Sequence, residues 1–174
     1  MVNTTALLVT TYLEMTDAAH FRPEFTDQPH LQIIRLEHPD VAFYRFLYGE
    51  VGRIWHWRDR LIMSEEELRQ AISLPGVTIH VLYMQGAPAG YVELRQQVDS
   101  TEIAYFGLRP EYMGMGLGKH LLSYGIQQGW EGGANRLWVH TCNLDGPYAI
   151  ANYIKRGFCI YKTEEQPMPQ RYVE

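Results

Sequence analysis

Apolar positions along the chain recur with two different periods, which predict where strands and helices lie. Short β-prone runs and alternation predict strands, and apolar residues three or four apart predict helices. Ser64 followed by Glu67 forms a capping box at the start of one helix. The expected order is two strands (5–15 and 31–36), two helices (from Pro39, and 64–73), three strands (77–84, 89–96 and 101–108), a glycine loop with a helix (109–131), and a final strand, short helix and strand (136–142, 145–157 and 158–162).

This order predicts one mixed α/β domain, with a central, mostly antiparallel sheet flanked by helices. The three middle strands are joined by tight turns and should form an antiparallel meander. The strand after the long helix is expected to lie parallel to the strand before it, through a right-handed crossover. The expected parts of the domain, residues 1–174, are N-terminal strands (1–36), two helices (39–73), the meander (77–108), the loop and its helix (109–131) and a strand–helix–strand unit (135–163).

Composition and charge narrow the classes of function. The chain is 46% hydrophobic, and its net charge of −5 gives no support for nucleic-acid binding. No apolar run approaches the roughly 18 residues that cross a membrane, and no signal-peptide pattern is present, so a cytoplasmic protein is expected. Cys142 and Cys159 form no C-x-x-C motif, and the seven histidines show no ligand spacing, so we expect no metal. An exposed sheet edge is compatible with a homodimer.

The stretch from Met113 to Lys119 carries the clearest chemical signal in the chain. Three glycines alternate with large apolar residues between a predicted strand and a predicted helix. Glycine lets another group approach the backbone N–H groups closely, and the N-terminus of a helix favours an anion. The loop therefore predicts a phosphate or pyrophosphate site, although a tight turn without a ligand has the same pattern.

Two common phosphate-binding motifs do not fit this loop. Lys119 is followed by His120, so the pattern G-x-x-x-x-G-K-[ST] is absent. A dinucleotide fingerprint requires the first strand of a βαβ unit and an acidic residue about 20 positions further on, and residues 134–137 supply no acid. A nucleotide-dependent enzyme that holds ATP in the loop remains an alternative at this point.

Two segments on either side of the long helix form a recognisable pair. Met113-Gly114-Met115-Gly116-Leu117-Gly118 is similar to the pattern Q/R-x-x-G-x-G/A, and Ala149–Phe158 is similar to A-x-x-x-Y-x-K-x-G-F. These patterns are motifs A and B of the GCN5-related N-acetyltransferases, the GNAT superfamily, which the chain resembles over roughly residues 77–162. Met113 stands where motif A has Gln or Arg, so one side-chain contact to a pyrophosphate is lost.

The resemblance implies a splayed sheet and acetyl-CoA as the co-substrate. The pantetheine arm would pair as an added strand with the backbone near Phe106, Gly107 and Leu108, where an N–H would polarise the thioester carbonyl. Asn143 and Asn152 are further candidates for contact with this arm, and each is equally suited to a cap or turn. The residues expected around the pyrophosphate are Met113, Gly114, Met115, Gly116, Leu117, Gly118 and Lys119.

The resemblance also suggests which groups move protons when a primary amine attacks the thioester. Tyr153 occupies the tyrosine position of motif B and is the expected acid for the departing thiolate, unless it only packs in the core. Glu102 is the candidate base, because some family members place a glutamate on this strand. On a regular strand Glu102 would share an apolar face with Phe106 and Leu108, which would raise its pKa, whereas a bulge would move it to the other face. His140 is a second candidate base.

The sequence says less about the acceptor. Trp55 and Trp57 could hold a cationic amine by cation–π contact, with Asp59 as a counter-charge. The same residues also suit two aromatic rings packed between helices. The acceptor, which could be a small amine, an amino acid or a protein amine, is not specified. A non-catalytic acyl-CoA-binding module on the same fold is the alternative function.

Overall fold

The computed structural model describes residues 6–173, so residue 5 of the first predicted strand lies outside the described part. The strands are β1 (Leu7–Met15), β2 (Leu31–Arg35), β3 (Val77–Met84), β4 (Ala87–Gln96), β5 (Thr101–Leu108), β6 (Leu137–Cys142) and β7 (Cys159–Pro167). The α-helices are α1 (Val41–Gly52), α2 (Glu65–Ser73), α3 (Leu117–Glu131) and α4 (Ala149–Arg156). Short 3-10 turns are η1 (Ala18–His20), η2 (Arg53–Trp55), η3 (Pro110–Tyr112) and η4 (Gln170–Tyr172).

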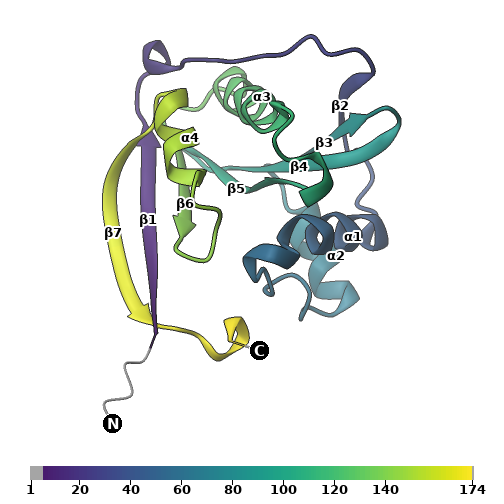
Figure 1. Ribbon diagram of the computed structural model, residues 1–174, viewed down its shortest axis with the longest axis vertical. Helices are drawn as coiled ribbons and strands as arrows, with labels where there is room; N and C mark the ends of the chain where they lie inside the picture. The colour runs from purple at the N-terminus through teal and green to yellow at the C-terminus, as the bar shows by residue number, and fades with distance from the viewer. Residues whose placement is uncertain (1–5, 174) are drawn as a thin grey trace.

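The strands form one mixed sheet in the order β2-β3-β4-β5-β6-β1-β7. β2 to β5 are antiparallel neighbours, and β3 to β5 are the predicted meander. β6 lies parallel to β5, which confirms the expected crossover. Three residue pairs join these two strands, the last of them Ile103 with Val139. Beyond that pair the strands diverge, and Figure 1 shows the sheet opening into two arms.

The N-terminal strand lies where the order of elements along the chain does not predict it. β1 is inserted between β6 and β7 and is antiparallel to both. Its ladder with β7 extends that strand to Pro167, so the predicted strand at 158–162 was too short. The added residues, 163–167, show no apolar pattern, since every residue of β7 is exposed. Backbone pairing with β1 holds them in the sheet.

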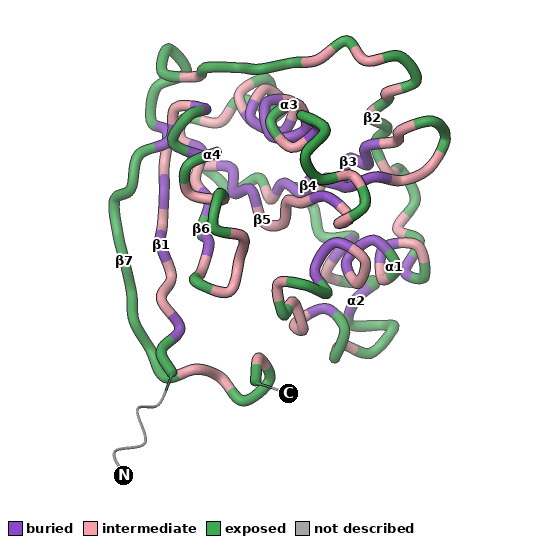
Figure 2. Tube along the Cα trace, viewed as in Figure 1, coloured by how far each residue is buried: buried purple, intermediate pink, exposed green. Residues whose placement is uncertain are grey.

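Each face of the sheet carries a separate hydrophobic core (Figure 2). The core on the α3 and α4 side includes Leu121 and Ile126 with Val92 of β4. The core on the α1 and α2 side includes Leu47 and Leu68. Helices therefore cover both faces of the β3–β5 arm, whereas β7 at the edge of the other arm remains exposed along its length.

The early helices follow their predicted starts with one shift. α1 begins at Val41, because the Asp40 side chain accepts a hydrogen bond from the Phe43 N–H, and not at Pro39. The two glycines that could end or loosen this helix differ in place: Gly49 lies inside α1, and Gly52 is its last residue. The capping box predicted at α2 is present. Among residues 6–173, no helix combines the length and apolar character needed to span a bilayer.

Candidate active site

The candidate site lies where β5 and β6 separate, and this divergence of the two strands is called the cleft below. Because pairing with β6 ends at Ile103, residues 104–108 of β5 present a backbone edge that β6 does not use. An extended ligand chain can add to such an edge as an extra strand. On this segment Gly107 faces α1, and a Cβ there would lie 2.6 Å from Val51 Cγ1, so glycine permits the close packing of strand and helix.

The glycine loop has the backbone of an anion cradle. Gly114 and Gly116 have φ angles of +76° and +77°, which favour glycine. Gly116 is the N-cap of α3, and no side chain caps this helix. The first N–H groups of α3 therefore have no partner within the helix and carry the positive end of its dipole. Met113 lies ahead of the cradle, 39% exposed, and offers no polar side-chain atom.

A pocket of about 330 Å³ shares Lys119 with this loop and is also lined by Asn152 and Lys155. Glu24 pairs there with the Lys119 ammonium at 2.8 Å and with the Arg156 guanidinium at 2.6 Å. Hydrogen bonds from Lys119 and Arg156 lower the pKa of the Glu24 carboxyl. Basic and amide groups thus lie beside the cradle, and Asn152, which the sequence offered as a contact for the pantetheine arm, is among them.

The connection between β1 and β2, residues 16–30, lies over the start of α3. The backbone N–H of Glu24 donates to Ser123 Oγ at 2.9 Å, and that of Thr26 donates to His120 Nδ1 at 3.1 Å. The Gln28 side chain donates to the carbonyl of Met115 at 2.9 Å. The segment therefore braces the glycine loop, a role that no local pattern in the sequence indicated.

Tyr153 lies on α4 with its ring buried in the α3-side core. The ring packs edge-on against Phe106 at 6.3 Å and Phe158 at 6.0 Å between centroids. Burial, and to a smaller extent the charge of Asp145, raises the pKa of the Tyr153 phenol well above its usual value. No hydrogen bond to its hydroxyl is present within residues 6–173, and the residue is 6% exposed.

A β-bulge in β5 determines the face of the sheet on which Glu102 lies. The pairing of β4 with β5 shifts register at Ala104, which leaves Glu102 opposite Arg95. It therefore does not share the face of Phe106 and Leu108 that a regular strand would give. Its nearly buried carboxylate lies 3.7 Å from the Arg95 guanidinium and 3.8 Å from His140 Nε2. The apolar setting expected on a regular strand is thus replaced by two basic neighbours.

The two tryptophans form a wall that reaches across the cleft. The Trp57 ring contacts the Tyr105 ring at 5.4 Å between centroids, and its Nε1 donates to Asp145 Oδ1 at 3.2 Å. Trp55 packs against the same β6–α4 loop, since a Cβ on Gly146 would lie 3.0 Å from its ring. Both tryptophans thus contact the loop between β6 and α4, and the structure adds Asp145 to them, whereas Asp59 pairs with the C-terminal residues Arg171 and Tyr172.

A buried ionic cluster of Glu93, Tyr44 and Arg60 packs against Tyr105, the residue that Trp57 contacts. Glu93 on β4 has no exposed surface, accepts a hydrogen bond from Tyr44 and accepts one from Arg60 at 2.9 Å. Burial raises the pKa of the Glu93 carboxyl, and the Arg60 guanidinium opposes that shift. Arg60 also lies 5.2 Å from the Tyr105 ring centroid. An acidic residue inside the apolar strand 89–96 was the sequence signal for this cluster.

Asn143 has a structural role in this fold. Its Oδ1 accepts from the Val9 N–H and its Nδ2 donates to the Leu7 carbonyl, both at 3.0 Å. The side chain thus continues the ladder between β6 and β1 beyond the last strand pair. Both of its polar atoms are satisfied by β1, and we do not retain Asn143 in the cofactor site.

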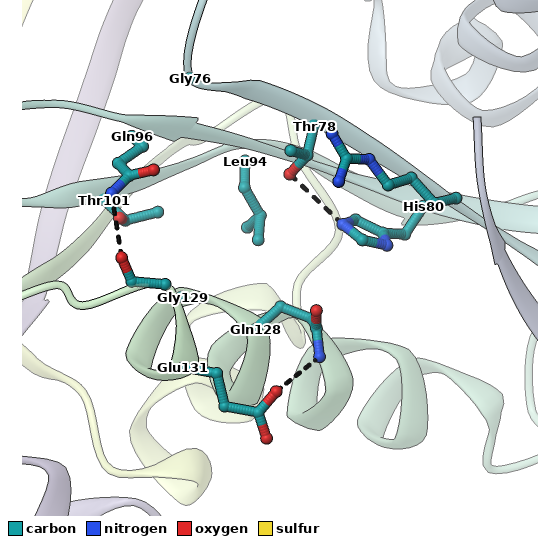
Figure 3. Close-up of a pocket in the computed structure, with 11 residues that line it drawn as sticks. Gly76, Thr78, His80, Leu94, Gln96, Thr101, Gln128, Gly129 and Glu131 are labelled. Carbon is teal, nitrogen blue, oxygen red and sulfur yellow. Dashed lines mark hydrogen bonds between the residues drawn. The ribbon is translucent and has the colours of Figure 1, made fainter. Parts of the chain in front are cut away.

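A second pocket, of about 320 Å³, lies at the opposite end of α3 and shares no residue with the cleft (Figure 3). His80 lines it, with Nδ1 3.1 Å from the Tyr124 hydroxyl and Nε2 3.3 Å from Thr78 Oγ1. Burial lowers the pKa of His80 to about 4, so the ring is neutral at physiological pH. Among residues 6–173, no three His, Cys, Asp or Glu side chains are placed to share a metal ion.

Comparison with known proteins decides the family. Residues 42–158 match the model described as "Acetyltransferase (GNAT) family". The chain belongs to the GNAT family. The match runs from α1 to the residue before β7, so it contains the glycine loop and the whole of the cleft wall. No curated protein matches the chain.

Solved structures of GNAT proteins share the fold. They include a GCN5-related N-acetyltransferase from Kribbella flavida, with 19% identity, a TM-score of 0.63 and coverage of 89% of this chain and 55% of that one. The ribosomal-protein-S18-alanine N-acetyltransferase from Escherichia coli has 20% identity, a TM-score of 0.59 and coverage of 73% and 76%. An aminoglycoside acetyltransferase from an uncultured soil metagenomic sample has 19% identity and a TM-score of 0.61, and the match covers 73% of this chain and 87% of that one. The chain spans 55% to 63% of the length of three of the matched structures.

Proposed function

We propose that the protein transfers the acetyl group of acetyl-CoA to a primary amine by direct attack of the amine on the thioester. Membership of the GNAT family supports acetyl transfer in general. The use of acetyl-CoA is supported by one observation: the free edge of β5 and the glycine loop are adjacent along the chain. The unpaired edge of β5, residues 104–108, leads directly through Arg109 and η3 to the uncapped, glycine-lined start of α3.

The residues around the cleft fit acetyl-CoA, which supplies an activated acetyl thioester. The free edge of β5 at Phe106–Leu108 offers backbone groups to a pantetheine arm. The first N–H groups of α3 suit a pyrophosphate, and Lys119 and Lys155 lie beside them. Because Met113 has no polar side-chain atom, the backbone alone would hold the pyrophosphate in this chain.

Proton removal from the acceptor is assigned to Glu102, with His140 beside it. Glu102 is almost buried on the cleft face of β5, whereas His140 is about half exposed on β6. Their facing atoms are 3.8 Å apart, longer than the roughly 2.6–3.2 Å of direct proton transfer, so the assignment requires this contact to shorten when the substrates bind. Glu102 would accept the proton and His140 would connect it to solvent.

Stabilisation of the leaving thiolate is assigned to the hydroxyl of Tyr153, at the position where the resemblance places the acid. Its raised pKa keeps the phenol protonated at neutral pH, so the hydroxyl is a hydrogen-bond donor throughout the working range. Phe106, on the same strand edge as the expected thioester, packs against the Tyr153 ring. A donor held in this position stabilises negative charge that develops on sulfur.

Two measurements test the proposal. Calorimetry should show that acetyl-CoA binds and that ATP does not, and thiol release should accompany incubation with acetyl-CoA and at least one member of a panel of primary amines. Binding of acetyl-CoA without turnover on any amine would indicate the non-catalytic acyl-CoA-binding module. Binding of ATP without acetyl-CoA would overturn the proposal entirely.

A further inference from the structure

The segment 168–173, here called the C-terminal strap, crosses from one arm of the sheet to the acceptor wall. It leaves β7 after Pro167, and the Met168 N–H donates to the carbonyl of Ala6 at 2.9 Å. Figure 1 shows it running from the lower end of β1 and β7 towards the connection between α1 and α2. The strap therefore links the two arms on the side of the cleft where the acceptor wall lies.

The strap ends on the carboxylate that the sequence predicts as a counter-charge for the acceptor. Arg171 Nε donates to Asp59 Oδ1 at 2.6 Å, and the Tyr172 hydroxyl donates to Asp59 Oδ2 at 2.9 Å. The Arg171 guanidinium also lies 4.6 Å from the centroid of the Tyr172 ring. A cation held by a carboxylate and an aromatic ring already occupies this position.

Asp59 belongs electrostatically to the cleft. It follows two residues after Trp57, whose ring contacts Tyr105. Burial, and to a smaller extent the charges of Glu93 and Asp59, raises the pKa of Tyr105, against the opposing Arg60 guanidinium. Arg60, the residue after Asp59, lies 5.2 Å from the centroid of the same Tyr105 ring, so Asp59 stands in the chain between two residues that contact Tyr105.

The contact is of a kind that a ligand can replace. The side chains of Arg171 and Asp59 are 47% and 40% exposed, and ion pairs with this exposure are individually weak. The Met168 N–H holds the start of the strap, and two backbone hydrogen bonds within the strap form its final turn. A competing cation on Asp59 can therefore replace the guanidinium of Arg171 in this pair.

We propose that Arg171 is an internal occupant of the acceptor site, and that the acceptor is a primary amine with a second cationic group that takes the place of Arg171 on Asp59. This inference rests on the proposed function, because the displacing amine is an acceptor only if the protein transfers acetyl groups. The displacement of Arg171 by a bound amine does not itself require catalysis. An amine without a second cation would leave Arg171 in place and would enter a narrower site.

Hydrogen exchange tests the displacement without acetyl-CoA. Agmatine carries an amine and a guanidinium, and n-butylamine has a similar chain without the second cation. Agmatine should accelerate exchange at the strap amides of Met168, Tyr172 and Val173, and n-butylamine should not. In Asp59→Asn these amides should exchange fast already without agmatine, and agmatine should not change their exchange rate. Arg69→Gln, which alters an exposed, carboxylate-paired arginine on α2, is the matched control and should behave as the wild type.

Steady-state kinetics test the consequence for selectivity. Arg171→Gln should lower the KM for agmatine relative to n-butylamine about two- to fivefold, the range expected on removal of a half-exposed competing ion pair, with kcat unchanged. An unchanged KM ratio together with agmatine-independent exchange would overturn the inference while acetyl transfer stands. Agmatine-dependent exchange that Asp59→Asn abolishes, in a protein that acetylates no amine, would support the occupant role and overturn the proposed function.

Discussion

Adding one methyl group at Gly118 should separate cofactor binding from folding. Gly118 is the second residue of α3, and a Cβ there would meet nothing nearer than Leu108 Cδ1 at 3.7 Å, an ordinary van der Waals distance. Alanine is favoured over glycine in a helix by roughly 0.5–1 kcal/mol. Gly118→Ala should therefore unfold at the same urea concentration as the wild type, or at a higher one.

The same methyl group stands beside the N–H groups that a pyrophosphate would approach. If close backbone contact holds the anion, Gly118→Ala should weaken acetyl-CoA binding about tenfold or more, equivalent to roughly 1.4 kcal/mol. Calorimetric titration measures this affinity directly, and urea unfolding of the same samples shows that the fold is intact. Gly116→Val is a less clean variant, because its φ of +77° would strain the free protein as well.

Gly49→Ala is the matched control. This glycine also lies inside a helix, α1, where a Cβ would lie 3.9 Å from Leu61 and no closer to any other side chain. It is on the other face of the sheet from α3, so the variant should gain similar stability and keep its affinity for acetyl-CoA. Wild-type affinity in a folded Gly118→Ala protein would refute the placement of the pyrophosphate at the start of α3.

Three further outcomes are expected. Tyr153→Phe should keep the core packing and lower kcat about tenfold or more with little change in the KM for acetyl-CoA, and an unchanged kcat would remove Tyr153 from the acid role. His80, whose pKa burial lowers to about 4, contributes stability that is complete above pH 6.5 and is lost as the pH falls towards 4, because the unfolded chain binds the proton first. Urea unfolding at pH 7.5 and 4.5 should show that the wild type loses about 2 kcal/mol more than His80→Gln, after allowance for partial solvation of the ring, and equal losses would contradict this reasoning. Gly157→Ala should lower stability by about 3 kcal/mol, because φ is +112° and the new Cβ would overlap the carbonyl oxygen of His20; thermal unfolding within a few degrees of the wild type would disagree.

The local signals in the sequence were sufficient for most of the elements. The capping box at Ser64, the end of the short helix at Gly157 and the apolar pattern from Val77 onward each act within a few residues, and each is present in the structure. The place of β1 was not predictable in this way. Alternation identifies a strand, but the choice of its neighbours depends on ladders with segments more than 120 residues away.

The features of the candidate site also differ in whether one short stretch of sequence determines them. The cradle could be predicted because glycine content and helix start lie in one short stretch, and its backbone has the expected conformation. The face of Glu102 could not, because the bulge at Ala104 is a mismatch between two strands and not a property of one. The pair of Glu93 and Arg60 likewise joins two elements, so only the acidic half left a trace in an apolar strand.

The position of β1 has a consequence for synthesis of the chain. Thr10 pairs with Cys142 on one side and with Glu164 on the other, so β1 has no sheet partner until those strands have left the ribosome. The β2–β5 arm, by contrast, pairs within residues 31–108 and can form early from nearby contacts. Residues 7–15 must therefore wait as an unpaired strand through most of translation, exposed to wrong partners and to chaperones. The arm that carries His140 therefore gains its full set of strand pairs only when β1 meets β6 and β7.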